Sequence, residues 1–253
     1  MTCFERVKEF YRSVAGEKKV IGKSCLGREI FAVKLGEGTP VGIVQCGIHG
    51  REFITSRLAV SQYRYGQITG SVWFLPLTNP DGALISESGE KPLWKANARG
   101  VDLNVNFDAD WGKGAKNVFH PASENYVGAY PFSEPETRAL RDFTLWAKPN
   151  YTVSYHTKGE EIYSRFKREL PGESVLGAVL SKSTGYPIVR TVGSVGGYKD
   201  WCIERLKVPS FTVEVGSDLL LHPIREEHFW EIERRNVRAI ADLSAAWELS
   251  VKK

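Results

Sequence analysis

Short apolar runs alternate with amphipathic stretches along almost the whole chain. The runs VGIVQCG, SVWFLPL and NYTVSY have the length of buried strands and show no polar alternation. The stretches between them carry apolar residues at helical spacing, and several end in glycine. This alternation predicts a three-layer α/β/α sandwich, in which helices cover both faces of a mixed, mostly parallel central sheet.

The predicted elements follow from these patterns. Strands are expected over residues 18–24, 28–36, 41–47, 71–77, 150–157, 187–192 and 210–216. Helices are expected over residues 1–16, 52–66, 133–148, 173–185, 198–206 and 225–249. The sequence TNPDG predicts a turn after the fourth strand. Ser133, with Glu136 three residues later, predicts a capping box that starts the third helix.

Size and charge exclude several classes of protein. The 253 residues fit one α/β domain over 1–253, and a net charge of +4 without basic blocks argues against a nucleic-acid partner. The first helix lacks a signal-peptide core, and no apolar run is long enough to span a membrane. None of the four cysteines forms a CxxC pair, so we expect free thiols, a cytoplasmic location and no membrane partner. The sequence does not indicate an oligomeric state.

Polar side chains stand where several predicted strands end. His49 follows the third strand, Asn79 and Asp81 follow the fourth, His156 ends the fifth, and Glu214 lies near the end of the last. Ligands of open α/β sheets bind where strands end and loops begin. We therefore expect these side chains to converge in one crevice.

The residue types at this edge suit a catalytic zinc ion. His49 and Glu52 are three residues apart and can reach one centre, and His156 offers a third ligand. Glu214 could then act as general base on a zinc-bound water. An isolated HxxE pair is weak evidence, because a histidine at a strand end is more often structural. That interpretation is kept for the other three histidines, His120, His222 and His228.

Five motifs in order resemble one family. HGRE, NPDG, GVDLNVNF, SYHT and FTVEVG are similar to the zinc carboxypeptidase A-like family, the funnelins, and the resemblance runs from about Val41 to Glu214. The resemblance implies a carboxypeptidase A-like fold, one Zn²⁺ per chain and a peptide substrate. It implies that His49, Glu52 and His156 are the zinc ligands and that Glu214 is the general base.

Further roles are implied by the same resemblance. Arg51 and Asn104 match groups that hold the substrate near its terminal carboxylate, and Asp102 matches the carboxylate that orients the first zinc histidine. The oxyanion-stabilising cation matches Lys95 or Arg99, and the sequence leaves both open.

Three positions depart from the family pattern. Val105 stands where the family has an arginine that anchors the C-terminal carboxylate. Lys199 stands where the family reads the substrate side chain, and lysine there calls for an anionic group. The family's mobile tyrosine falls near Val192, and Tyr198 is the nearest tyrosine along the chain.

These departures favour one substrate. LWKANARGVDLN also resembles a bacterial branch that cleaves the γ-D-glutamyl-meso-diaminopimelate bond of peptidoglycan peptides. The extra carboxylate of diaminopimelate would suit Lys199. The alternatives are a metallocarboxypeptidase for C-terminal acidic residues, an aspartoacylase-like zinc acylase, and a zinc-bearing binding module without turnover. Glu214 argues against the last, because a binding module has no use for a base.

Overall fold

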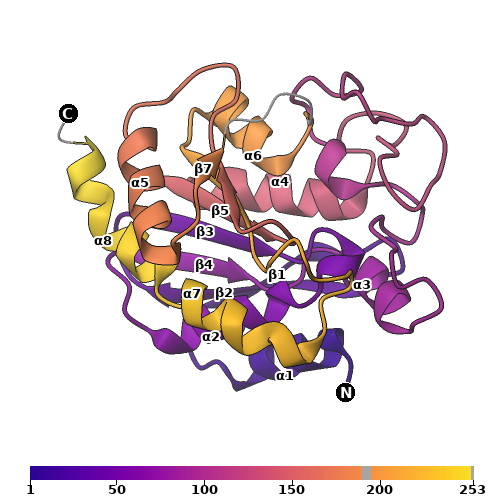
Figure 1. The fold of residues 1–253 in the computed structure, drawn as a ribbon, viewed down its shortest axis with the longest axis horizontal. Helices are drawn as coiled ribbons and strands as arrows, with labels where there is room; N and C mark the ends of the chain where they lie inside the picture. Colours follow the sequence, from indigo (N-terminus) through magenta and orange to yellow (C-terminus); the bar gives the residue numbers. More distant parts are fainter. Residues whose placement is uncertain (190–194, 252–253) are drawn as a thin grey trace.

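The computed structural model describes residues 1–189 and 195–251. These residues form one sheet of eight strands, in the order β1-β2-β4-β3-β5-β8-β6-β7 (Figure 1). The strands are β1 (Lys18–Lys23), β2 (Glu29–Gly36), β3 (Val41–Cys46), β4 (Ser71–Leu75), β5 (Tyr151–His156), β6 (Glu161–Tyr163), β7 (Ile188–Val189) and β8 (Ser210–Glu214).

The helices lie mainly between these strands. They are α1 (Cys3–Ser13), α2 (Thr55–Tyr65), α3 (Pro80–Glu87), α4 (Pro135–Ala147), α5 (Glu173–Thr184), α6 (Tyr198–Trp201), α7 (Phe229–Asn236) and α8 (Ala239–Val251). Short turns of 3-10 helix occur at η1 (Gly50–Glu52), η2 (Leu103–Val105) and η4 (Glu226–His228), and a π-helical turn at η3 (Cys202–Leu206). No described helix is long and apolar enough to cross a membrane.

Parallel pairing in the middle of the sheet brings the carboxyl ends of several strands to one edge. β4, β3, β5 and β8 pair in parallel, whereas β1, β2 and β6 join by antiparallel pairs. β3 lies between β4 and β5, so the chain moves outward from β3 in both directions. Such a switch point leaves an opening at the carboxyl ends of the strands. The ends of β3, β5 and β8 are neighbours there.

The two faces of the sheet carry separate apolar cores. On one face, alternate residues of β3, β4, β5 and β8 pack against α1, α2, α5, α7 and α8. On the other face, Ile43, Trp73 and Leu75 pack against residues of α4 and α6. Figure 1 shows these two groups of helices on either side of the sheet. The three-layer α/β/α arrangement predicted from the sequence is confirmed.

The predicted turn after β4 is wrong. Residues 78–82 instead lead into α3, with Asn79 as N-cap and Pro80 in the first turn. The Asn79 side-chain oxygen accepts a hydrogen bond from the Gly82 amide at 2.9 Å. Asparagine and proline occur in turns and at helix starts alike. The asparagine side chain accepts a hydrogen bond from a free backbone amide in both structures, and proline has no amide that needs a partner.

Two further helix predictions need correction. Glu134, not Ser133, is the N-cap of α4, and the predicted capping box does not form. The Ser133 hydroxyl instead donates to the Glu134 carboxylate. The single closing helix predicted over 225–249 is divided into η4, α7 and α8. The division follows Asn236, whose amide donates to the Ile232 carbonyl and the Tyr186 hydroxyl and so competes with the helical pattern.

The remaining boundaries agree with the expectations to within a few residues. Of the strand predicted over 187–192, positions 190–192 lie outside the described residues, and Ile188–Val189 forms β7. All four cysteines are free, as expected. The cytoplasmic location stays a prediction.

Candidate zinc site

His49 and Glu52 come from the turn that follows β3. His49 is the N-cap of η1 and Glu52 is its last residue. Gly50 lets this turn pack tightly, since a Cβ atom there would lie 2.4 Å from the Gly82 carbonyl oxygen. His156 is the last residue of β5, the strand next to β3. The strand order therefore brings together ligands that are 104 residues apart in sequence.

The ligand atoms face one another at short range. His49 Nδ1 lies 2.9 Å from Glu52 Oε1 and 3.1 Å from His156 Nδ1. His156 Nδ1 lies 3.0 Å from Glu52 Oε2. All three residues are buried. Three such atoms bound tetrahedrally to zinc would lie roughly 3.3 Å apart, given zinc–nitrogen bonds of about 2.0–2.1 Å.

This donor set fits zinc. Two imidazoles and one carboxylate, buried and within 4.8 Å of one another, are the ligand type of a catalytic zinc site with an open position. Burial would raise the pKa of Glu52, but the adjacent histidines, His49 foremost, hold it well below its ordinary value. The carboxylate is therefore ionised, as a metal ligand must be.

Asp102 and Lys95 support the first ligand. Asp102 Oδ1 lies 3.3 Å from His49 Nε2, and Asp102 Oδ2 lies 3.0 Å from Lys95 Nζ. A carboxylate at Nε2 keeps the proton there and leaves Nδ1 free to bind a metal. Burial would raise the pKa of Asp102, but Lys95 and His49 hold it well below its usual range. The geometry thus agrees with the predicted orienting role of Asp102, which stays a prediction.

Glu214 stands beside the ligands on the next strand. It ends β8 and is paired in register with His156. Neighbouring strands are about 4.8 Å apart, so the carboxylate lies within reach of a group bound at the three ligands. Burial raises the pKa of Glu214 to about 8. Its position fits a general base.

The two candidate oxyanion cations occupy different places. The Lys95 side chain is largely buried beside Asp102, at the zinc ligands. Arg99 is half-exposed and lies 3.6 Å from Glu134, a residue that bonds to Asn97 and Ser133. Only Lys95 is thereby brought next to the candidate site.

The predicted substrate-binding residues are partly engaged by the protein itself. The Arg51 guanidinium lies 3.4 Å from both the Leu93 carbonyl and Glu124. Asn104 accepts a hydrogen bond from the Tyr198 amide through its side-chain oxygen, which leaves its NH₂ group for another acceptor. Lys199 donates to the Asp200 carboxylate at 2.6 Å and to the Arg165 carbonyl at 3.1 Å. Their roles toward substrate stay predictions.

Tyr198 cannot serve as a mobile tyrosine. It is fully buried, and its hydroxyl lies 2.9 Å from the Thr144 hydroxyl. The position of the family's tyrosine, Val192, lies outside the described residues. Val105 is 7% exposed and presents no charge.

Three side chains near the site were not predicted from the sequence. His222 lies 3.4 Å from the Thr157 hydroxyl, next to His156. Burial lowers the pKa of His222 to about 4. Glu161 and Tyr163, on β6, pair in register with Glu214 and Thr212. No motif marked Glu161 and Tyr163, because the antiparallel pairing of β6 with β8 determines their positions.

Two expected members of the crevice have other tasks. The Asn79 amide donates to the carbonyls of Ile48 and Ala96. Asp81 lies 2.6 Å from Arg28 and accepts a hydrogen bond from the Leu26 amide. Both side chains are thus bonded to surrounding loops rather than placed among the three ligand atoms. They hold the loops around the candidate site.

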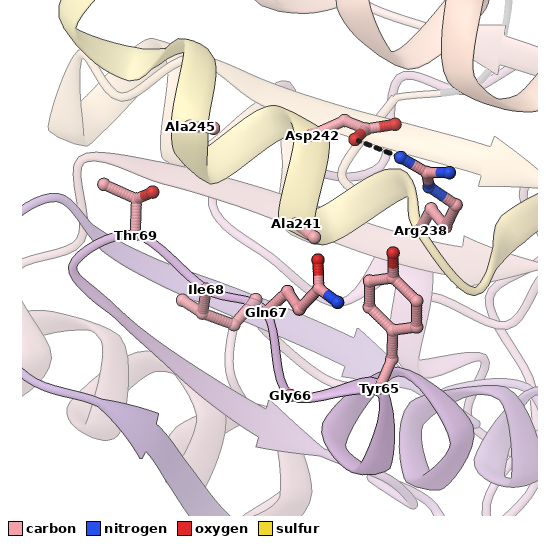
Figure 2. A pocket seen from close by; sticks show the side chains of 9 residues that line it. All are labelled: Tyr65, Gly66, Gln67, Ile68, Thr69, Arg238, Ala241, Asp242 and Ala245. Atoms are coloured by element: carbon pink, nitrogen blue, oxygen red, sulfur yellow. Dashed lines mark ion pairs between the residues drawn. The ribbon is translucent and has the colours of Figure 1, made fainter.

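A separate pocket of about 390 Å³ lies between the end of α2 and α8 (Figure 2). Figure 2 shows Tyr65, Gln67 and Arg238 at its wall, and an ion pair between Arg238 and Asp242. None of the predicted site residues lines it.

The chain belongs to the zinc carboxypeptidase family. The family described as "Zinc carboxypeptidase" matches residues 10–235, which include the three candidate zinc ligands. This membership agrees with the resemblance carried by the five motifs.

Two relatives are similar to most of the chain. The chain is 30% identical over 247 residues to "Gamma-D-glutamyl-L-diamino acid endopeptidase 1" of Lysinibacillus sphaericus, covering 81% of this chain and 62% of that protein. It is 30% identical over 241 residues to "Carboxypeptidase B" of Rattus norvegicus, covering 78% of this chain and 57% of that protein. The chain therefore spans less than two thirds of the length of these relatives.

Solved structures share the fold. Bovine thrombin-activatable fibrinolysis inhibitor superposes with a TM-score of 0.83 at 22% identity, covering 98% of this chain and 95% of that chain. Murein-tripeptide amidase MpaA from Escherichia coli O157 superposes with a TM-score of 0.68 at 26% identity, covering 92% and 94%. The predicted carboxypeptidase A-like fold is confirmed.

Proposed function

We propose that this protein is a zinc-dependent peptidase. The observation that carries the proposal is the convergence of His49, Glu52 and His156 in one buried cluster, with Glu214 on the adjoining strand end. Two histidines, a glutamate ligand and a second, free glutamate are the parts that metal-assisted hydrolysis of an amide requires.

Each side chain has a defined task in this proposal. Zinc held by the three ligands would supply Lewis-acid chemistry, which makes water nucleophilic at neutral pH and polarises a carbonyl. Glu214 would accept the proton of the attacking water and pass it to the leaving amine. Lys95, whose ammonium is held beside the ligands by Asp102, would stabilise the negative charge that develops on the carbonyl oxygen. Arg51 and Asn104 would position the substrate.

The proposed substrate is a peptidoglycan peptide, cut at the γ-D-glutamyl-meso-diaminopimelate bond. Val105 offers no charge for a main-chain carboxylate, whereas Lys199 offers an ammonium for a carboxylate on the substrate side chain. The names of two relatives support this choice, one an endopeptidase for γ-D-glutamyl-L-diamino acid bonds and the other a murein-tripeptide amidase.

A carboxypeptidase for C-terminal acidic residues is the second candidate. Lys199 favours it too, because glutamate and aspartate also carry a side-chain carboxylate. In either case the substrate must share the Lys199 ammonium with Asp200, which lies 2.6 Å away. The two candidates differ in the linkage that they cleave.

The test compares three substrates with the zinc-loaded protein. These are L-Ala-γ-D-Glu-meso-diaminopimelate, the same peptide with lysine in the last place, and an ordinary peptide ending in glutamate. We expect kcat/KM to be about ten- to a hundredfold higher for diaminopimelate than for lysine, because a hydrogen bond to a charged group contributes about 1.5–3 kcal/mol. Lys199→Met should erase most of this preference and leave the zinc content unchanged.

Lys167→Met is the matched control, since Lys167 lies on the surface and pairs with Asp110 and Glu204. It should keep the preference. Equal rates of the wild type on the lysine and diaminopimelate peptides would contradict the assignment of Lys199. Faster cleavage of the ordinary glutamate peptide would favour the second candidate.

A further inference from the structure

Two rows of side chains run across β5, β8 and β6 on one face of the sheet. Register pairs His156 with Glu214 and Glu214 with Glu161, which forms the row at the zinc end. The second row, of Ser154, Thr212 and Tyr163, lies two residues back along each strand. Residues two apart in a strand project to the same face and are about 6.6–7 Å apart.

This face is polar, whereas the opposite face is apolar. Between the rows, Tyr155, Val213 and Ile162 point into the large core on the other side. The polar face therefore looks toward α6, which packs against β5 and β8. Polar side chains that converge beside a candidate catalytic centre can fix the orientation of a bound substrate.

A buried group without a partner lies in this wall. Ser154 is 2% exposed, and its hydroxyl has no hydrogen-bond partner in the described part of the chain. Buried hydroxyls are nearly always paired, so an unpaired one beside a candidate active site points to a polar ligand.

Glu161 is the second unusual group. Its carboxylate accepts a hydrogen bond of 2.6 Å from the Tyr163 hydroxyl. Within residues 1–189 and 195–251, no lysine, arginine or histidine forms an ion pair with it. An oxygen of Asp218 lies near the same point beside Gly159 as the Glu161 carboxyl carbon, and that oxygen is paired with Lys158 at 3.5 Å. Because Lys158 is engaged by Asp218, the partly exposed Glu161 carboxylate has a hydrogen-bond donor but no ion-pair partner of its own in the described part of the chain.

The neighbouring carboxylate shows the contrast. Glu160 is the residue before Glu161, and it lies 2.7 Å from Arg235. Among the described residues, one of the two adjacent glutamates therefore has an ion-pair partner, whereas the other has only a tyrosine hydroxyl as hydrogen-bond donor. Burial, and after it the hydrogen bond to Glu161, raises the pKa of Tyr163, so the hydroxyl stays a proton donor and fixes the carboxylate in place.

We propose that Glu161, positioned by Tyr163, binds an ammonium group on the side chain of the residue that follows the cleaved bond. Lys199 contacts the same segment of the chain beyond the end of β6, because its ammonium donates to the carbonyl of Arg165, two residues after Tyr163. Glu161 would then bind the ammonium, and Lys199 the carboxylate, of a zwitterionic side chain. The inference rests on the proposed function and narrows its substrate class to diamino acids that end in an ammonium and a carboxylate.

The experiment removes only the ammonium from the substrate. L-Ala-γ-D-Glu-meso-diaminopimelate is compared with the same peptide ending in L-2-aminopimelate, which keeps both carboxylates and lacks the side-chain amine. We expect the wild type to favour diaminopimelate about ten- to a hundredfold in kcat/KM. Glu161→Gln should abolish this ratio, and Tyr163→Phe should reduce it. Glu160→Gln is the control and should keep it.

A second comparison separates this inference from the proposed function. N-blocked dipeptides ending in lysine or norleucine also differ by one ammonium and contain no γ-D-glutamyl bond. If the wild type ignores γ-linked peptides but favours lysine over norleucine through Glu161, the proposed substrate fails and the ammonium site stands. Calorimetric binding of free diaminopimelate and 2-aminopimelate gives the same ratio without turnover. Equal values for the paired compounds, or a preference retained in Glu161→Gln, would overturn the inference.

Discussion

Asp102 connects an imidazole and an ammonium group at the zinc ligands. One carboxylate oxygen faces the His49 imidazole and the other faces the Lys95 ammonium, while the backbone amides of Asn104 and Asn125 donate to them. A fully buried carboxylate is costly unless all its acceptor sites are used. Here they are used, so the side chain can hold the His49 ring and the Lys95 ammonium in fixed positions.

Within residues 1–189 and 195–251, the Glu214 carboxylate has no such set of fixed donors, which suits a residue that must exchange a proton. Glu214→Gln keeps the size of the side chain and removes its basic site. Because general-base catalysis contributes about 10²–10⁴-fold, we expect kcat to fall about 100-fold or more while zinc content and melting temperature stay near wild type. The measurement is turnover of a metal-replete preparation, with the exposed Glu90→Gln as control. Near-wild-type turnover in Glu214→Gln would show that another group is the base.

Among the elements, α3 holds the turn that carries His49. The Asn79 side chain caps this helix and also donates to the Ile48 and Ala96 carbonyls, so one amide joins the helix, the end of β3 and the following loop. α1 has an ordinary cap by comparison, in which Thr2 and Glu5 satisfy each other's amides at the surface.

Because of this difference, we expect two cap substitutions to lower the free energy of unfolding by different amounts. Asn79→Ala removes the cap and leaves buried carbonyls without donors, so we expect the free energy of unfolding to fall by about 2–4 kcal/mol. Thr2→Ala removes only an exposed cap and should cost about 0.5–1 kcal/mol. Urea denaturation of both variants measures the difference. Equal losses would mean that Asn79 acts as a helix cap alone.

At the scale of the whole molecule, sequence patterns predicted what depends on local periodicity and on motifs. The layers, nearly all strands and the His49, Glu52 and His156 ligand set belong to this group. The strand that carries each ligand is visible in the sequence, and parallel strand ends meet at one edge.

Features that depend on pairing between distant segments were not predictable. The positions of Glu161 and Tyr163 follow from the antiparallel register of the three-residue strand β6, which no periodicity reveals. Asp81 and Arg99 are strand-end or motif residues in sequence, but their partners, Arg28 and Glu134, direct them away from the ligands. Which residue forms an ion pair with Asp81 or Arg99 depends on how distant segments pack in three dimensions.

We expect bound zinc to stabilise the entire domain. Its ligands come from the turn after β3 and from the end of β5, so unfolding must separate them. A ligand that binds only the folded state at a free concentration 1,000 times its Kd adds about 4 kcal/mol. In a domain of this size that raises Tm by roughly 8–16 °C. Calorimetry with and without a chelator measures this shift in the wild type.

His156→Ala provides the matching comparison. It should bind little zinc, and its Tm should therefore respond little to the chelator, although the side chain lost is small relative to the core. Metal analysis of both proteins accompanies the melting curves. A wild-type Tm unchanged by metal removal, or stoichiometric zinc bound in His156→Ala with undiminished affinity, would contradict the assignment of the three ligands, because a site that joins two neighbouring strand ends cannot lose one of its three donors without weakening both binding and stability.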